Sequence, residues 1–329
     1  MRSIYFWVLA LLIFGGCVPD PYGAIFVPHY TQHLRPTAWS DDGETLYLLY
    51  ANRSGENLDS TLFYLTVDVN SRETTFLHNE RNASGVFYLG KDAESRQLMF
   101  YSADERTPEL IALSPEKSAN NPSRIALQDD NFRAIPRMFL MDGYILGPLA
   151  SMSSSDDFFR WGRHRLLDHS NVVFEMDLEK VKPLAYLSAL DNRVYLSSYY
   201  PGQVTSKALG EQHAVGKIEL EQAVISDLEN LPPYDGYLRF RDWLSEDEIL
   251  FSQVRENGTY LQSVSYQIST QAYRVREDFH QQGLLSPDKS KVAFVEGDFL
   301  MISNADGSQA RKILYIPRDL PKGDPEILG

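Results

Sequence analysis

Cys17 is the only cysteine in this chain of 329 residues. A lone thiol has no partner for an intramolecular disulfide, so the stability of the chain must come from its core. Cys17 directly follows Gly15-Gly16, which end an apolar run over Ile4–Phe14. Small residues before a thiol suit cleavage by a peptidase, and the exposed thiol can then form a thioether. The sequence therefore predicts that Cys17 is chemically modified.

Residues 1–16 have the parts of a secretory signal peptide: a positive start at Arg2, an apolar stretch of about ten residues and small residues before the cleavage position. With Cys17 next, the segment resembles a bacterial lipoprotein signal, although Phe14 stands where leucine is usual. The resemblance implies lipidation of Cys17, followed by a short tether over residues 17–23. The alternatives are a plain signal peptide with a free cysteine and an uncleaved anchor, which would need roughly 20 apolar residues.

Motifs for catalysis or metal binding are scarce. The sequence has no G-x-S-x-G elbow, no H-E-x-x-H and no cysteine cluster, and it predicts no catalytic, cofactor-binding or metal-binding residue. His164, Asp168 and His169 form the one histidine cluster. On a strand, His164 and Asp168 share a face while His169 points away, which disfavours a common metal. Asp41-Asp42-Gly43 resembles a calcium loop only in composition, because turn chemistry explains it.

Acidic residues outnumber basic ones by 45 to 31, which gives a net charge of −14. This balance argues against nucleic acid as a partner and against a basic patch for anionic lipid. Membrane attachment would therefore rest on the acyl chains at Cys17. One acyl chain binds a bilayer marginally, whereas two or more bind it stably.

A pattern of strand and turn residues recurs along the chain. The clearest copy, Leu285–Ile316, has three short apolar segments separated by Pro, Asp, Asn and Gly, at spacings of about ten residues. It opens with Leu285 seven positions before Val292, and Trp39 and Trp243 repeat that spacing. Weaker copies start near residues 91, 138 and 187. The mean repeat of about 50 residues suits a four-stranded propeller blade.

The segment Ser286-Pro-Asp, followed by Val292-Ala-Phe and Asn304-Ala-Asp-Gly-Ser, resembles the repeat of TolB-type, WD40-like β-propellers. That repeat also occurs in the propeller domains of prolyl-oligopeptidase-like enzymes. The resemblance implies an all-β propeller over residues 24–318, with six blades predicted and seven as the alternative, and a tail over residues 319–329. Ring closure leaves only short, protected edges.

In such rings the last blade is usually completed by a strand from the other terminus. We therefore expect Ala24–Val27 or Thr31–Leu34 to pair with Lys312–Ile316.

Two inserts interrupt the strand rhythm. Residues 151–162 carry Phe158, Phe159 and Trp161 on a polar segment, and large aromatics in a loop are candidates for binding a partner. The alternative, which we favour, is that the loop folds back and buries them on the propeller wall. The second insert, Lys207–Asn230, has apolar residues at near-helical spacing and is expected to form a surface helix.

The expected function is non-enzymatic. The chain would be an exported lipoprotein, held in the membrane by its N-terminal lipid (palmitate), whose propeller binds an envelope protein, peptide or polymer without a cofactor. Val18 follows the cysteine in place of aspartate. In a Gram-negative cell this resembles the pattern for sorting to the outer membrane, on its periplasmic side. In a cell without an outer membrane, the protein would lie on the outer face of the cell membrane.

The alternative function is catalytic: an envelope enzyme, such as a glycosidase or lyase, that uses carboxylates at the propeller channel. A third alternative is an assembly part of a larger envelope complex with no ligand of its own.

Overall fold

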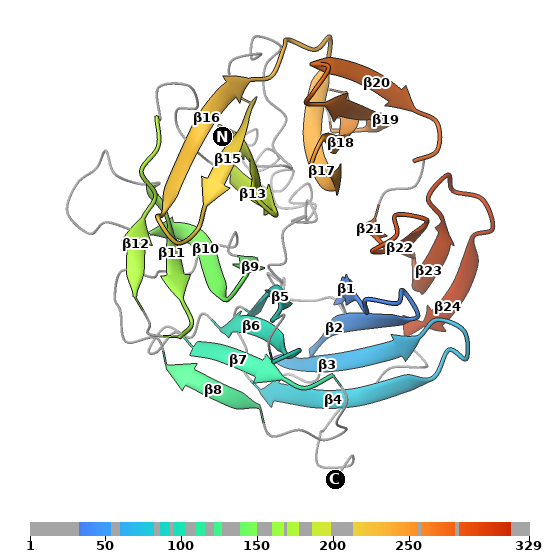
Figure 1. Ribbon diagram of the computed structural model, residues 1–329. Coiled ribbons are helices and arrows are strands. Elements are labelled where there is room, and N and C mark those ends of the chain that lie inside the picture. The colour runs from blue at the N-terminus through green and yellow to red at the C-terminus, as the bar shows by residue number, and fades with distance from the viewer. Residues whose placement is uncertain are drawn as a thin grey trace, which may run out of the picture.

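The computed structural model describes residues 33–53, 60–81, 86–92, 95–102, 109–115, 122–126, 139–149, 160–167, 170–177, 186–198, 213–255, 258–279 and 283–316. These residues form six four-stranded antiparallel sheets, arranged as blades around a central axis (Figure 1). The predicted all-β, six-bladed propeller is confirmed. Both predicted domain limits, at residues 24 and 318, fall outside the described ranges, as do residues 1–23 and 319–329.

Each blade is one continuous stretch of chain whose first strand lies nearest the axis and whose fourth lies at the periphery (Figure 1). Blade 1 comprises β1 (His33–Trp39), β2 (Thr45–Arg53), β3 (Ser60–Asp68) and β4 (Thr74–Arg81). Blade 2 comprises β5 (Val86–Lys91), β6 (Leu98–Ser102), β7 (Glu109–Leu113) and β8 (Ser123–Ala126). Blade 3 comprises β9 (Phe139–Met141), β10 (Tyr144–Leu149), β11 (Arg160–Arg165) and β12 (Asn171–Val173).

The second half of the ring repeats this order. Blade 4 comprises β13 (Tyr186–Leu190), β14 (Arg193–Ser197), β15 (His213–Glu219) and β16 (Val224–Asn230). Blade 5 comprises β17 (Tyr237–Ser245), β18 (Glu248–Val254), β19 (Tyr260–Gln267) and β20 (Ala272–Arg276). Blade 6 comprises β21 (Leu284–Leu285), β22 (Lys291–Glu296), β23 (Phe299–Asn304) and β24 (Arg311–Tyr315).

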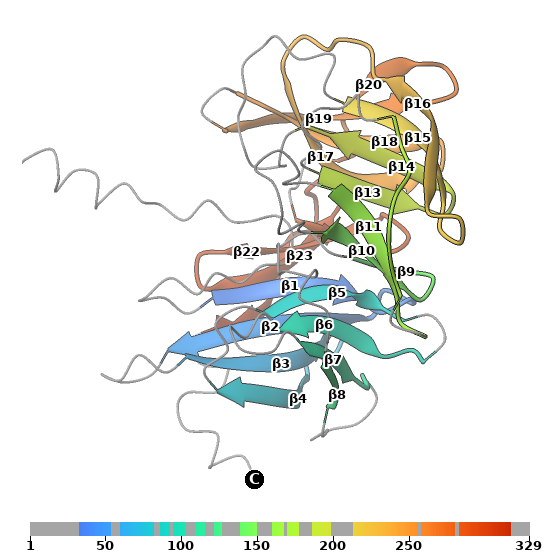
Figure 2. The same cartoon turned by 90° about the vertical axis from the view of Figure 1, so that its left-hand side faces the viewer.

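Strand direction alternates within a blade, so the turn between its first and second strands and the turn between its third and fourth strands lie at the same end of the ring. We call this the turn end; β2 points away from it in Figure 2. Several of its turns are as short as Asp142-Gly143 or Asp191-Asn192. Asp142 and Asp191 adopt left-handed φ values of 48° and 50°, which aspartate tolerates better than most residues.

The core is divided among the six boundaries between neighbouring blades, each filled by its own cluster of buried apolar side chains. Alternation along the strands explains this arrangement, because residues at odd and even positions face opposite neighbours. A blade thus buries both of its faces only when both of its neighbours are in place.

Within the described residues, blade 6 and blade 1 share no strand at the seam where they meet. The expected closure by Thr31–Leu34 is wrong where it can be followed, because Leu34 pairs with Tyr50 inside blade 1. Residues 24–32 lie outside the described ranges. Within those ranges, β24 pairs only with β23, and apolar side chains from both blades fill the seam. Arg311 adds a hydrogen bond from Nη2 to the Val69 carbonyl at 3.2 Å.

Two tryptophans link neighbouring blades at equivalent repeat positions. Trp39 Nε1 donates to the Leu284 carbonyl across the seam at 3.1 Å. Trp243 Nε1 donates to Ser188 Oγ of the preceding blade at 3.2 Å. Both indoles are buried, so each bond combines apolar packing with a satisfied polar group.

We expect Trp39→Phe to lower the free energy of unfolding by about 1–3 kcal/mol, because it removes buried volume and leaves the Leu284 carbonyl without the indole donor. Urea unfolding followed by circular dichroism measures this change. The control is Val295→Ala, an exposed position on β22, which should shift stability by less than about 0.5 kcal/mol. Equal urea midpoints for Trp39→Phe and the wild type would show that the stability of the seam does not depend on Trp39.

The boundary between blades 4 and 5 is rich in aromatic rings and contains one histidine. His213 begins β15 and stacks on Tyr195, whose hydroxyl lies 2.6 Å from Nδ1. Burial lowers the pKa of His213 to about 4, because the charged imidazolium is poorly solvated there. The histidine is therefore neutral in the folded protein at physiological pH.

His213 should make the fold acid-sensitive above the range in which most carboxylates titrate. The unfolded chain takes up a proton near pH 6.5 and the folded chain only near pH 4, so stability falls as the pH drops between these values, by as much as about 3 kcal/mol. We expect His213→Gln to flatten this decline. Urea midpoints at pH 7 and pH 4.5 test it, and parallel declines in both proteins would contradict it.

The surface helix expected within Lys207–Asn230 is wrong over the described part, which forms β15 and β16. The tight turn at residues 220–223 and a bulge between Val215 and Lys217 interrupt the strand alternation. Together they space the apolar residues as a helix would. Ala223, with a φ of 54°, lies outside the helical region.

Candidate functional site

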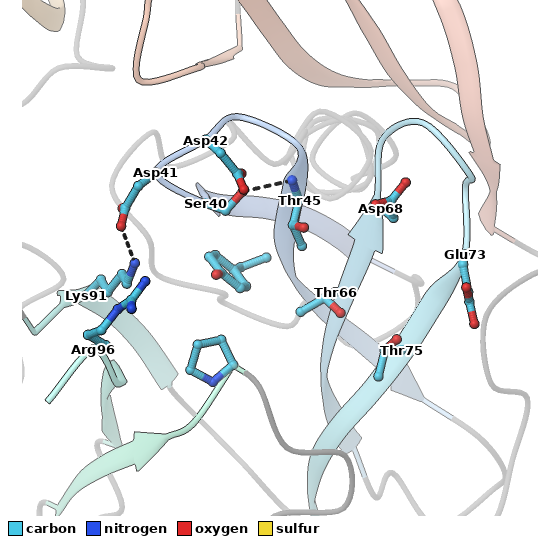
Figure 3. A pocket seen from close by; sticks show the side chains of 12 residues that line it. Ser40, Asp41, Asp42, Thr45, Thr66, Asp68, Glu73, Thr75, Lys91 and Arg96 are labelled. Carbon is cyan, nitrogen blue, oxygen red and sulfur yellow. Dashed lines mark hydrogen bonds and ion pairs between the residues drawn. The ribbon is translucent and has the colours of Figure 1, made fainter.

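A cavity of about 490 Å³ lies at the turn end, between blades 1 and 2 (Figure 3). Its lining is mostly polar or charged and comes from both blades. The lining residues are Ser40, Asp41, Asp42, Thr45, Tyr47, Thr66, Asp68, Glu73, Thr75, Lys91, Arg96 and Pro115. Small-molecule sites commonly have volumes of this order.

The cavity exists because the face that blade 1 turns toward blade 2 changes character along its strands. Away from the turn end that face is apolar and packs on blade 2 through Leu49, Leu62 and Tyr64, among others. Closer to the turn end the same face becomes polar in two rows. The first row is Tyr47–Thr66–Thr75, joined by strand register, and the second is formed by Thr45, Asp68 and Glu73. Polar side chains there do not continue the apolar contact.

The charges are separated by blade. Blade 1 supplies every carboxylate of the lining: Asp41, Asp42, Asp68 and Glu73. Blade 2 supplies both cations, Lys91 at the end of β5 and Arg96 in the following turn. One ion pair crosses the gap, from Lys91 Nζ to Asp41 Oδ2 at 2.6 Å (Figure 3).

Two of the carboxylates belong to turn structure. Asp42 accepts a hydrogen bond from Ser40 Oγ at 2.5 Å and another from the Glu44 amide at 3.0 Å, and these bonds lower its pKa. Asp68 accepts the amides of Asn70 and Ser71 at 2.9 and 2.6 Å, the latter being the main reason for its lowered pKa. Both groups are therefore ionised at neutral pH.

The Ser40–Asp42 arrangement recurs in blade 6, which identifies it as a feature of the repeat. Ser286 Oγ donates to Asp288 Oδ1 at 2.6 Å, and the pKa of Asp288 falls to about 2, chiefly through that bond. In both blades the serine also accepts the amide five residues later, Thr45 or Lys291. The interpretation of Asp41-Asp42-Gly43 as turn chemistry is confirmed.

Glu73 and Arg96 are the uncommitted charges of the cavity. Among the described residues, neither the Glu73 carboxylate nor the Arg96 guanidinium takes part in an ion pair or a side-chain hydrogen bond. Both are exposed and lie on opposite walls. They are available to a ligand without breaking an existing contact.

Thr66, on β3 of blade 1, lies between Glu73 and Arg96 (Figure 3), and only 8% of its surface is exposed. Its side chain lines the cavity, and its hydroxyl has no hydrogen-bond partner within the part of the chain that the structure describes. Within the described residues this hydroxyl is not one of the fully buried polar atoms that lack a partner, so water or a ligand in the cavity can bond it.

Thr66→Val should therefore leave the free energy of unfolding unchanged or raise it by up to about 1 kcal/mol, because no hydrogen bond is lost. Thr37→Val is the matched control in the same blade. Thr37 Oγ1 donates to the Tyr47 carbonyl at 2.9 Å, so its loss should cost about 1 kcal/mol. Chemical denaturation of both variants makes the comparison, and a larger loss for Thr66→Val than for Thr37→Val would contradict it.

Of the three candidate partner-binding aromatics, only Trp161 is described, and it is buried, as the favoured interpretation expected. Trp161 lies within β11 and is 1% exposed, in the cluster between blades 3 and 4, so its indole is core and unavailable to a partner. Phe158 and Phe159 lie outside the described residues, as does Cys17.

The histidine cluster is only partly described. His164 is buried, with Nδ1 2.8 Å from Asn171 Oδ1, whereas Asp168 and His169 lie outside the described residues. In the described ranges, no group of three or more His, Cys, Asp or Glu side chains is placed to hold a metal ion.

A second cavity, of about 660 Å³, lies at the same end and is lined mainly by β15 and β16 of blade 4. Lys217 and Asp227 in its wall pair with each other at 2.7 Å. The described residues include no helix long and apolar enough to cross a bilayer.

No protein-family model and no curated protein matches the chain. Among solved structures it is similar to an oligogalacturonate lyase in complex with manganese, at 12% identity and a TM-score of 0.50, covering 86% of this chain and 77% of that one. It is also similar to the β-propeller domain of the Trilobed protease from Pyrococcus furiosus, at 10% identity and a TM-score of 0.49, covering 87% and 84%.

TolB from Acinetobacter baumannii, whose repeat the sequence resembles, is another structural neighbour, at 12% identity and a TM-score of 0.35, covering 81% and 79%. At such identities the likeness concerns the fold alone. A shared fold does not by itself imply a shared function.

Proposed function

We propose that this protein is a non-enzymatic binding propeller of the cell envelope that takes a ligand in the cavity between blades 1 and 2. The observation that supports this function is the pair of uncommitted, opposite charges, Glu73 and Arg96, on the two walls of that cavity. The ligand would be an envelope protein, peptide or polymer.

The walls are suited to binding because they are preorganised. Tight turns fix the blade 1 side, and the apolar cluster beneath the cavity packs blade 1 on blade 2. A rigid site spends little free energy on ordering side chains and loops. Affinity would then come from complementarity between the ligand and the two charged walls.

A catalytic role is less well supported by the same residues. A carboxyl that acts as a general acid at neutral pH needs a raised pKa, and often gains it from burial or a like charge. Hydrogen bonds instead lower the pKa of Asp42 and Asp68. These two groups therefore suit the binding of hydrogen-bond donors or cations better than proton donation.

The proposal includes lipidation at Cys17, which would hold the propeller at a membrane surface. In a Gram-negative cell that surface would be the periplasmic side of the outer membrane, and in other cells the outer face of the cell membrane. Confinement to a surface raises the effective concentration of the propeller toward envelope ligands.

Cys17→Ser should release the protein from membranes, because no acyl chain could then be attached. Fractionation of cells expressing the full chain, followed by immunoblotting, measures the change. The wild type should sediment with membranes and the variant should appear in the soluble fraction. Retention of the variant in membranes would contradict lipid anchoring.

Ligand binding at the cavity is tested by affinity purification in mild detergent, with co-eluting molecules identified by mass spectrometry. A specific companion should be reduced at least about fivefold by the double variant Glu73→Gln/Arg96→Gln, since charged hydrogen bonds contribute about 1.5–3 kcal/mol each. Glu44→Gln/Arg72→Gln is the control, because both residues are exposed and lie outside the cavity. Equal recovery with both double variants would contradict the site.

A further inference from the structure

We infer that the cavity between blades 1 and 2 binds a short zwitterionic peptide, with its ammonium group toward the carboxylates of blade 1 and its carboxylate toward the cations of blade 2. This inference rests on the proposed function and names the ligand class of the same site.

The separation of charge across the cavity carries the inference. Asp41, Asp42, Asp68 and Glu73 all come from blade 1, and Lys91 and Arg96 from blade 2. After the Asp41–Lys91 pair is counted, Glu73 and Arg96 face the cavity without a partner among the described residues. A ligand with opposite charges at its two ends satisfies both of them at once.

Ligands with other charge patterns satisfy the cavity less well. An anion would meet Arg96 but would be repelled by the negative charges of Asp42, Asp68 and Glu73. A simple cation would meet Glu73 but leave Arg96 desolvated without a partner. A neutral saccharide would cover both charges without compensating either, and a covered, unpaired charge is costly.

The polar row of blade 1, which lies between Glu73 and Arg96 (Figure 3), can hydrogen-bond the backbone in the middle of a peptide. Thr66 and Thr75 are paired across β3 and β4, and Tyr47 lies opposite Thr66 on β2. The Thr66 residue is nine-tenths buried, its side chain lines the cavity, and its hydroxyl has no hydrogen-bond partner within the described ranges. A hydroxyl both donates and accepts, so it can bond either the N–H or the C=O of a peptide unit.

The test uses tripeptides, because the sequence preference is open. An equimolar library with free ends is compared with two matched libraries, one N-acetylated and one C-amidated. Binding to the purified propeller is measured by saturation-transfer NMR and, for the best peptides, by isothermal titration calorimetry. We expect the free-ended peptides to bind and each cap to weaken binding about tenfold or more, since each removes one charged contact.

Variants assign each end of the peptide to a wall. Glu73→Gln should weaken the free-ended peptides and leave binding of the N-acetylated ones unchanged. Arg96→Gln should weaken binding of the free-ended peptides and leave binding of the C-amidated peptides unchanged. The controls are Glu44→Gln and Arg72→Gln; Arg72 and Arg96 both adopt left-handed φ values, 64° and 57°, so the two arginine substitutions have similar backbone effects. Thr66→Val should weaken all three libraries by a smaller factor.

Two results would overturn the inference: no binding of free-ended peptides at concentrations up to about 10 mM, well beyond a weak 1 mM affinity, or equal binding of free and capped peptides. Failure of this inference is distinguishable from failure of the proposed function. If the peptides do not bind but the co-purifying companion is still lost with Glu73→Gln/Arg96→Gln, the site is correct and the ligand class is wrong. If the companion is unaffected as well, both are wrong.

Discussion

Within the described residues, the first and last blades of this propeller meet through apolar packing and side-chain hydrogen bonds to backbone carbonyls, and neither blade contributes a strand to the sheet of the other. The seam is held by a buried apolar cluster, by the Trp39 indole on the Leu284 carbonyl and by Arg311 on the Val69 carbonyl. Every blade needs two neighbours to bury its faces, so the whole ring depends on this boundary. The geometry of blade 1, which supplies most of the candidate site, depends on it directly.

The candidate site lies where one blade departs from the apolar packing that holds neighbouring blades together. Inter-blade faces are apolar where blades touch, yet the face of β3 changes from Leu62 and Tyr64 to Thr66 and Asp68 within the same alternating positions. Such departures from local consistency are expected where function outweighs packing. The result is a cavity whose walls are as rigid as the blades that carry them.

Much of the fold could be predicted from the sequence because the spacing of apolar residues in the repeat reflects which residues pair between neighbouring strands. Trp39 pairs with Leu46 and Leu285 with Val292 across the first turns of their blades, which explains the seven-residue spacing. Trp243 has the same spacing in sequence but pairs with Ile249, because bulges shift that hairpin. Closure by Thr31–Leu34 was mispredicted, since pairing between distant segments leaves no local pattern in the sequence, and Ala24–Val27 lies outside the described residues.

The candidate site was largely hidden in the sequence. Glu73 and Arg96 lie in separate turns, and no motif links them, so only the assembled blades bring them to one cavity. The polar positions that end β3 were a readable signal, because Thr66 and Asp68 interrupt an otherwise apolar face. Trp161 shows why an aromatic residue next to a polar segment is weak evidence for a binding site, since it lies in a strand and is buried.

Over the described residues each sheet is built from one continuous stretch of chain, and this has a consequence for how such a ring can be rearranged. A circular permutation that joins the present ends and opens the chain between two blades would cut no sheet, and the old seam would gain a covalent link. In a ring closed by a shared strand, the same operation would divide a sheet at the old junction. The blade is thus also the unit by which gene duplication or deletion could lengthen or shorten this architecture.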